Sequence, residues 1–254
     1  MKYALVNGSR VEATPGLRGE CPGCASPMIA RCGEVRLNHW PHKGRLRCDP
    51  WWENETEWHR AWKNCFPQAC QEVVHKDNDG QRHIADVKSP GGWVIEFQHS
   101  PIPPDERRAR ENFYKRLIWV VDGTRRKRDK GQFFAQLEDS LANRSNSMFK
   151  QLVVEGALLS DWVTSQADVV FDFGGDTLWH QTSDRAASWV WVFPTARHTF
   201  IELTSASGDS AAGGWPNLLS ERTEAISNLK AQQQSAIYPP PTRKARTNRR
   251  YSRF

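Results

Sequence analysis

The sequence lacks any long apolar stretch. None of its hydrophobic runs approaches the ~18–20 residues that a membrane-spanning helix needs, and the first 16 residues lack the apolar core of a secretory signal peptide. We therefore expect a soluble, cytoplasmic protein without membrane contacts. In that reducing compartment the six cysteines are expected to be thiols or metal ligands rather than disulfides. The DFG triplet at 172–174 occurs without any other kinase motif and is interpreted as a chance match. No small-molecule cofactor is expected.

Acidic residues are missing from residues 238–254, which carry six Lys or Arg. Once these six of the 35 basic residues are set aside, 29 remain against 29 acidic ones, so the net charge of +6 resides in this segment. Proline-led basic segments of low hydrophobicity are typically disordered and attract polyanions such as nucleic acid. We expect residues 237–254 to be a disordered basic tail, with a purely solubilising role as the alternative.

The rest of the chain divides into three stretches of different character. Residues 1–52 are rich in Cys, His, Gly and Pro, which is typical of a chain held by a metal. Residues 53–150 alternate helical and extended patterns: helices are predicted at 55–66 and 102–116, and strands at 72–75, 83–87, 93–100 and 117–123. Residues 151–236 predict a smaller α+β region of unknown role, with strands at 168–175, 187–193 and 198–205 and a helix at 218–234.

Two close pairs of metal-ligating residues occur in the first stretch. Cys21 and Cys24 form a CPGC knuckle, and His39 and His42 form an HWPH pair about 14 residues later. Each pair can reach one ion from a tight turn, which makes a tetrahedral zinc site attainable, and because the protein supplies all four ligands the zinc would be structural. Free thiols and surface histidines are the competing interpretation. Two further cysteines compete for a ligand position, Cys32 and Cys48.

The second stretch predicts a carboxylate site. Glu96 and Gln98 are two apart on a predicted strand, so they share one face, and a hairpin turn at 89–92 would bring Asp86 alongside Glu96. Two converging carboxylates suit Mg²⁺ or Mn²⁺, which can activate water for phosphodiester hydrolysis. Glu57 on the preceding helix is a candidate third carboxylate. Solvated acids flanking apolar strands are the alternative.

The motifs taken together resemble the competence protein CoiA family. They are CPGC, HWPH, ETEWHRAWK, HIADV, IEFQHSPI, Arg110-x3-Tyr114 and IWVVDG, spanning about residues 20–125. The nuclease domain of that family is similar to the PD-(D/E)xK endonucleases, so the resemblance implies a mixed α+β or α/β fold with a restriction-endonuclease-like αββαβ core. It further implies that Glu57, Asp86 and Glu96 are the catalytic acids.

Gln98 departs from the superfamily pattern, which has a lysine at this position. An amide cannot accept a proton from water or offer a full positive charge, although it can orient water. The missing charge is expected from one of three cations near the site: Lys63, which matches a polar position of the family's helix, Lys88 or Arg110.

A stripe of Arg107, Arg110 and Tyr114 is the candidate DNA-binding surface. Their three- and four-residue spacing places them on one helix face, where guanidinium groups can bind DNA phosphates. An ordinary solvated stripe is the alternative. His83 and His99 border the catalytic strands and are candidates for outer-sphere partners.

Two functions compete on these observations. The first is a Mg²⁺- or Mn²⁺-dependent deoxyribonuclease that acts in DNA uptake, recombination or processing. The second is a zinc-containing DNA-binding adaptor with a degenerate nuclease site, which would assist the recombination machinery. Phage defence or a mobile element is a further setting for the same family likeness. DNA is the expected partner in each case.

Overall fold

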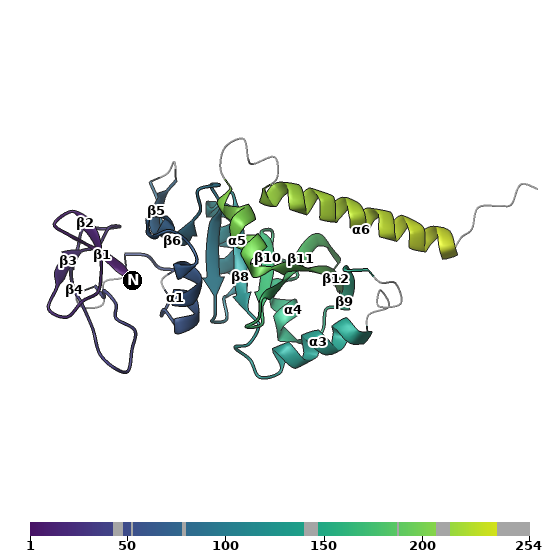
Figure 1. Ribbon diagram of the computed structural model, residues 1–254, viewed down its shortest axis with the longest axis horizontal. Coiled ribbons are helices and arrows are strands. Elements are labelled where there is room, and N and C mark those ends of the chain that lie inside the picture. The colour runs from purple at the N-terminus through teal and green to yellow at the C-terminus, as the bar shows by residue number, and fades with distance from the viewer. Residues whose placement is uncertain are drawn as a thin grey trace, which may run out of the picture.

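The computed structural model describes residues 1–42, 48–51, 53–77, 80–139, 147–186, 188–206 and 214–237. Within these ranges the chain is a mixed α+β protein with two sheets and six α-helices (Figure 1). No helix in these ranges combines the length and apolarity needed to cross a bilayer. The expected basic tail lies outside the described residues, apart from Ile237.

The smaller sheet is formed by the N-terminal residues. Its four short strands are antiparallel and lie in the order β2-β1-β3-β4. An Asn7–Gly8 turn with both φ angles positive joins the first two strands, as a tight hairpin requires. The strands are β1 (Tyr3–Val6), β2 (Ser9–Glu12), β3 (Arg18–Glu20) and β4 (Pro27–Ile29).

The larger sheet has eight strands in the order β5-β6-β7-β8-β10-β11-β12-β9. The first three strands form an antiparallel meander, β7, β8 and β10 run parallel, and the remainder are antiparallel. The strands are β5 (Gln71–Lys76), β6 (Arg82–Lys88), β7 (Val94–Gln98), β8 (Leu117–Asp122), β9 (Lys150–Val153), β10 (Asp168–Asp172), β11 (Thr177–Ala186) and β12 (Trp189–Ala196).

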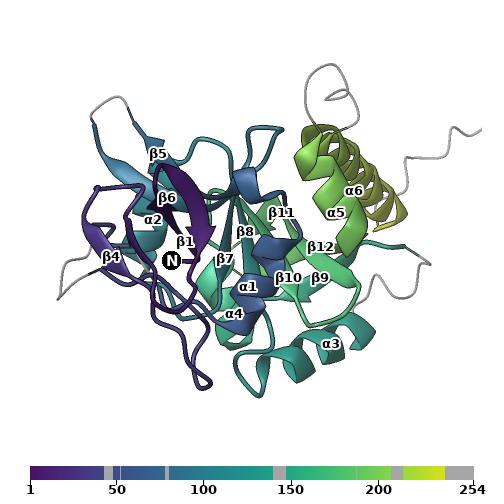
Figure 2. The ribbon, with the colours of Figure 1, turned by 60° about the vertical axis from the view of Figure 1, so that its left-hand side comes forward.

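Helices cover both faces of this sheet (Figure 2). Residues of α1, α5 and α6 pack with Ile118 and Val120 on one face, whereas residues of α3 and α4 pack with Trp119 and Val121 on the other. The alternation along β8 is what a strand buried on both faces requires. The helices are α1 (Glu57–Asn64), α2 (Pro104–Phe113), α3 (Asp129–Asp139), α4 (Gly156–Trp162), α5 (Arg197–Ser205) and α6 (Trp215–Ile237).

Most predicted elements lie where the patterns place them, but one has the wrong type. The segment 198–205, predicted as a strand from its β-branched residues, belongs to helix α5. Phe200 and Thr204, four apart, are both fully buried, and the ring of Phe200 packs against Trp62 and Trp215. Tertiary packing overrides the local β preference here. The strands β1–β4, β9 and β11 and the helices α3 and α4 were not predicted.

The expected boundary at residue 150 falls inside one continuous sheet. Strand β10 pairs in parallel with β8 along its whole length, from Asp168 opposite Ile118 to Asp172 opposite Asp122. Residues 151–236 therefore extend the sheet of residues 53–150. The two-residue alternation of a strand cannot reveal which strands pair across the 45 positions between Asp122 and Asp168, because pairing is decided by tertiary packing.

Candidate functional site

The strands β6 and β7 separate at the position where two acids face each other. The β6–β7 ladder pairs Val87 with Ile95. Beyond this pair, the two strands are linked by hydrogen bonds from backbone amides to side-chain carboxylates. The amide of Asp86 donates to Oε1 of Glu96 at 3.3 Å, and the amide of Phe97 donates to Oδ2 of Asp86 at 3.1 Å. Each carboxylate thus takes a backbone donor from the opposite strand, which brings Asp86 and Glu96 together.

These two acids line a small cavity of about 70 Å³ between the meander, α1 and the segment that follows the N-terminal sheet. Its lining holds six carboxyl groups but only two basic side chains, Lys63 and Arg110. The cavity therefore carries an excess of negative charge, which favours a cation. The six acids are Asp49, Glu53, Glu55, Glu72, Asp86 and Glu96.

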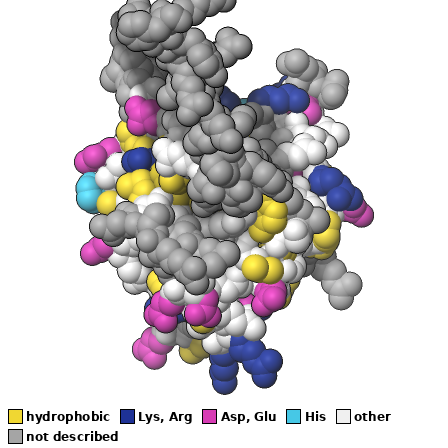
Figure 3. Space-filling view, turned by 90° about the vertical axis from the view of Figure 1, so that its right-hand side faces the viewer, with side chains coloured by type: hydrophobic (Ala, Val, Ile, Leu, Met, Phe, Trp, Pro, Cys, Tyr) yellow, Lys and Arg dark blue, Asp and Glu magenta, His cyan; other side chains and the backbone are white. Residues whose placement is uncertain are grey.

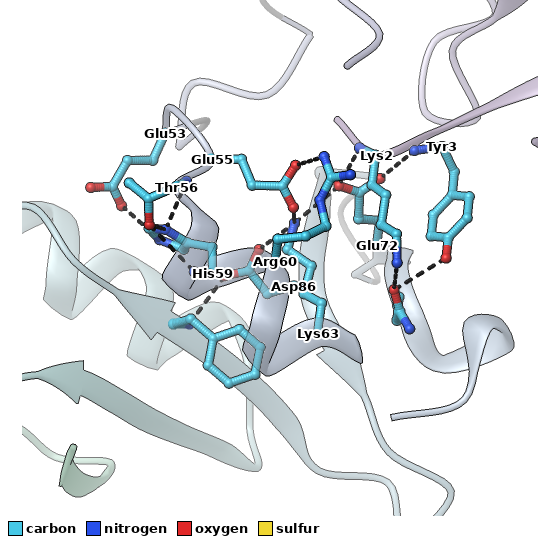
Figure 4. Close-up of polar contacts among 12 residues, drawn as sticks. Lys2, Tyr3, Glu53, Glu55, Thr56, His59, Arg60, Lys63, Glu72 and Asp86 are labelled. Atoms are coloured by element: carbon cyan, nitrogen blue, oxygen red, sulfur yellow. Dashed lines mark hydrogen bonds and ion pairs between the residues drawn. The ribbon is translucent and has the colours of Figure 1, made fainter. Parts of the chain in front are cut away.

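Lys63 lies at the centre of the acids (Figure 4). Its Nζ is 3.0 Å from Glu55 Oε1, 3.0 Å from Glu72 Oε1 and 3.3 Å from Asp86 Oδ1. Burial opposes its charge, but the surrounding carboxylates outweigh burial and raise the pKa of Lys63. The side chain is therefore a permanent cation beside Asp86, fixed by three partners.

The surroundings of Lys63 favour its charged form, whereas those of Glu96 disfavour its charged form. Glu96 is 5% exposed, and burial together with the charge of Asp86 raises its pKa to about 8. Arg110, whose NH1 lies 3.2 Å from Glu96 Oε2, offsets this only in part. Glu96 therefore retains its proton at neutral pH unless a cation compensates its charge.

His59 faces the same cavity from α1. The helix begins with a capping box in which the Thr56 hydroxyl accepts from the His59 amide, and Nδ1 of His59 accepts from the Thr56 amide at 3.3 Å. A backbone amide can only donate, so in the neutral ring the proton is on Nε2, 3.9 Å from Glu53 Oε2. Burial lowers the pKa of His59 despite the nearby charges of Asp86 and Glu53, so the ring is a neutral N–H donor.

Glu57 does not lie in this cavity. It is the first residue of α1 and is exposed, and it lines a neighbouring hollow that shares Met1 and Glu55 with the cavity. The acids that enter the cavity from this part of the chain are Glu53 and Glu55, in the extended segment before the helix. The backbone changes from extended to helical at the N-cap Thr56, so Glu55 precedes this change and Glu57 follows it. Threonine followed by a helical pattern is the sequence signal that could have indicated this.

Gln98 shares the strand face of Glu96 but does not contact Asp86 or Lys63 in the described contacts. It is 3% exposed, and its Nε2 donates to Glu53 Oε2 at 3.2 Å and to the Ser100 carbonyl at 2.8 Å. Its amide nitrogen is therefore bonded to Glu53 and to the Ser100 carbonyl. These bonds position Glu53, and the role of Gln98 in orienting water stays a prediction. Lys63 and Arg110 reach the acids, whereas Lys88 instead lies 3.5 Å from Nδ1 of His75.

The predicted DNA-binding stripe is not an exposed face. Arg107 is 2% exposed, with its guanidinium hydrogen-bonded to the Asp161 carbonyl and to Oγ1 of Thr164. Arg110 and Tyr114 are buried as well and line the acidic cavity. Arg107 is therefore a structural residue, because the helix carrying this stripe packs on the chain at 161–164. Helical spacing fixes which residues share a face but not which face is covered.

A second candidate site lies in the N-terminal region. The ligand atoms of Cys21, Cys24, His42 and Cys48 all lie within 4.8 Å of one another, and no other His, Cys, Asp or Glu group of three or more does so in the described ranges. Sγ of Cys21 is 3.6 Å from Sγ of Cys48, and Sγ of Cys24 is 3.3 Å from Nε2 of His42. Hydrogen bonds with Ser26 and His42 overcome burial and lower the pKa of Cys24 to about 6. Three sulfurs and one imidazole in this space fit a zinc ion.

Cys48 takes the ligand position that was predicted for His39. The HWPH segment is extended and pairs antiparallel with the strand region before it, His42 opposite Met28 and His39 opposite Arg31. Three extended residues span about 10 Å, so only one of the two histidines can reach the knuckle. His39 instead has its Nδ1 2.8 Å from the Leu37 carbonyl.

No protein-family model matches the chain, and no curated protein sequence or solved structure does. What the two sites can do therefore follows from their own groups. On the face viewed from the α6 end, acidic, basic and hydrophobic side chains are interspersed where the surface is coloured, without a patch of one kind (Figure 3). The acidic cavity and the thiol cluster remain the features with a defined chemistry.

Proposed function

We propose that the chain is a metal-dependent deoxyribonuclease in which Asp86 and Glu96 bind Mg²⁺ or Mn²⁺. The observation that carries this proposal is the convergence of two cross-strand carboxylates in a cavity with six acids and two basic side chains. Oxygen ligands and excess negative charge are what these hard cations select, and Mg²⁺ commonly takes only one or two protein carboxylates.

The order of elements around the acids supports the same proposal. Helix α1, the β5-β6-β7 meander, helix α2 and the parallel strand β8 follow one another, with the two acids on the meander. This order is that of the αββαβ core that the resemblance to the CoiA family implies, with one additional strand, β5, at the edge of the sheet. The bound cation would polarise a phosphodiester and supply an activated water.

Lys63 and Arg110 have the remaining roles in the proposed reaction. Lys63 presents a fixed positive charge 3.3 Å from Asp86, and this charge would stabilise the developing negative charge on the phosphate. It cannot serve as a base, because its raised pKa keeps it protonated. Arg110 holds Glu96 through NH1 and is itself fixed by Glu106 and the Trp51 carbonyl. Lys63 thus takes the role that the superfamily assigns to the lysine replaced by Gln98.

We propose a structural role for the thiol cluster, with zinc held by Cys21, Cys24, His42 and Cys48. Because the protein supplies all four ligands, no position is left for a substrate. The zinc would tie the chain at residue 48 to the N-terminal knuckle, immediately before the segment that contributes acids to the cavity.

The test is cleavage of linear, circular and single-stranded DNA by the purified chain with Mg²⁺, with Mn²⁺ or with EDTA. Asp86→Ala should reduce cleavage by several orders of magnitude while DNA binding is retained, because a ligand of the catalytic ion is lost. Glu57→Ala is the matched control, since this exposed acid on α1 lies outside the cavity, and it should cleave like the unaltered chain. DNA binding without cleavage under any metal would favour the adaptor function instead.

A further inference from the structure

A histidine–aspartate pair lies beside the acidic cavity and has no role in the proposed metal site. His99 follows the end of β7, and its Nδ1 donates to Oδ2 of Asp122 at 2.7 Å. Asp122 is 3% exposed, and its other oxygen accepts from the amide and the hydroxyl of Thr124 at 2.8 and 2.6 Å. Because both oxygens of Asp122 accept hydrogen bonds, its carboxylate is held in place and fixes the orientation of the His99 ring that donates to it.

The hydrogen bond to Asp122 also fixes where the ring can accept a proton. An ionised carboxylate only accepts, so Nδ1 carries the proton and the lone pair of the neutral ring is on Nε2. Nε2 has no partner among the contacts of the described residues, and the side chain is 35% exposed. His99 therefore presents a free basic nitrogen to solvent, oriented by a buried acid.

The pair lies next to the cavity, beside a residue that lines it, although neither His99 nor Asp122 is in the lining itself. The ring of His99 is 6.0 Å from that of His59, which lines the cavity, and 6.2 Å from the ring of Trp58. Arg125 donates to the His99 carbonyl at 3.1 Å, which holds the backbone as well. The charged and titratable groups facing His99 are thus Asp122 on β8, His59 on α1 and Arg125 in the loop after β8.

The other groups around the cavity are committed elsewhere. Lys63 is protonated and paired with three acids, and the amide of Gln98 is bonded to Glu53 and Ser100. His59 uses Nδ1 as an acceptor for the Thr56 amide, so its Nε2 carries the N–H group. The two histidines consequently have opposite tautomers: His59 offers an N–H group and His99 offers a lone pair.

We propose that His99, positioned by Asp122, is the general base of the proposed nuclease, an inference that rests on that function. The attacking water loses a proton to Nε2 of His99 as its oxygen bonds to phosphorus. One P–O ester bond breaks, the leaving oxygen takes a proton from solvent, and His99 afterwards returns its proton to solvent. His59 donates a hydrogen bond to a phosphate oxygen without giving up its proton.

The experiment measures the pH dependence of kcat/KM with Mg²⁺ for the full chain, for His99→Gln and for Asp122→Asn. General-base catalysis contributes about 10²–10⁴-fold, so His99→Gln should lose at least about 100-fold and lose the acidic limb of the profile. His198→Gln, an exposed histidine on α5, is the matched control and should behave like the unaltered chain. Added imidazole should restore part of the activity of His99→Ala, which a merely structural role would not allow.

DNA affinity measured with Ca²⁺ should be unchanged in His99→Gln, which separates binding from chemistry. If His99→Gln and His99→Ala cleave at the rate of the unaltered chain with the same pH profile, while Asp86→Ala is inactive, the role of His99 is overturned and the nuclease stands. Loss of activity without imidazole rescue and with an unchanged profile in the residual activity also overturns it. If the unaltered chain cleaves no DNA with any metal, the nuclease itself is overturned, and this inference with it.

Discussion

Nδ1 of His83 donates a 2.9 Å hydrogen bond to Oδ1 of Asp49, the residue that follows the zinc-ligand candidate Cys48. The other oxygen of Asp49 accepts from the Ile84 amide at 2.7 Å, and the ring of Trp51 stacks on His83 at a centroid distance of 3.2 Å. One short segment therefore connects the thiol cluster to strand β6, which carries Asp86. The thiol cluster and the acidic cavity are neighbours along the chain as well as in space.

The ligand set of the zinc site gives the first prediction. Cys48→Ser should lose the zinc, whereas His39→Ala should keep about one zinc ion per chain, because His39 is bonded away from the cluster. Metal analysis of the purified variants measures this directly. Cys65→Ser, which removes the exposed cysteine at the C-terminal end of α1, controls for the loss of a thiol. Retention of zinc by Cys48→Ser together with its loss from His39→Ala would restore the ligand set predicted from sequence.

Removal of the zinc should also disturb the acidic cavity. The segment of residues 48–51 and 53–56 contributes Asp49, Trp51, Glu53 and Glu55 to the lining, and its attachment to the N-terminal sheet passes through Cys48. We expect a zinc chelator to increase hydrogen exchange in this segment and to abolish Mg²⁺-dependent cleavage, with the centre of the larger sheet still protected. Equal exchange in the segment with and without zinc would show that the two sites are independent.

Lys63 gives a prediction about stability. Replacing it by methionine leaves Glu55, Glu72 and Asp86 without their shared cation, and removing one partner of a buried ion pair costs about 3–5 kcal/mol. Denaturant unfolding of Lys63→Met measures this cost. Lys88→Met is the matched control, because Lys88 is half-buried and contacts only His75 in the described contacts, and it should change the free energy of unfolding by less than about 1 kcal/mol. A cost as small as that of the control would mean that the acids are protonated rather than paired.

Glu72 predicts how stability depends on pH. Burial raises its pKa, but Lys63 and the amides of Lys2 and Tyr3 outweigh burial and lower the pKa to about 2. The unfolded value is about 4.3, so Glu72 stabilises the fold above that pH by about 3 kcal/mol, and this is lost as pH falls from about 4.5 to 2. Glu72→Gln should flatten the stability curve in this window, measured by urea unfolding at several pH values. An unchanged slope would assign the acid sensitivity to other carboxylates.

The sequence predicts the local part of this site and misses the part that depends on distant segments. Alternation along a strand and a glycine turn suffice to bring Asp86 to Glu96, because both constraints are local. That Glu55 rather than Glu57 lines the cavity depends on where the helix begins, at the N-cap Thr56. The burial of Arg107 depends on residues 161–164, more than 50 positions away, and the choice of Cys48 over His39 on how an extended segment lies against another. Helical or strand periodicity carries no information about such contacts.

Gln98→Lys provides the sharpest comparison between motif and structure. This change places a lysine where the PD-(D/E)xK pattern, which the chain resembles, has one. That pattern alone predicts that cleavage increases. The structure predicts no gain, because position 98 contacts Glu53 and the Ser100 carbonyl, while the cation beside Asp86 is Lys63. We expect Gln98→Lys to cleave no faster than the unaltered chain, and Lys63→Gln to lose most activity even when combined with Gln98→Lys. Steady-state cleavage of linear DNA with Mg²⁺ measures both, with Gln98→Met reporting the loss of the amide alone. A tenfold or greater gain in kcat for Gln98→Lys, or rescue of Lys63→Gln by it, would show that the position-98 side chain reaches the reacting phosphate after all.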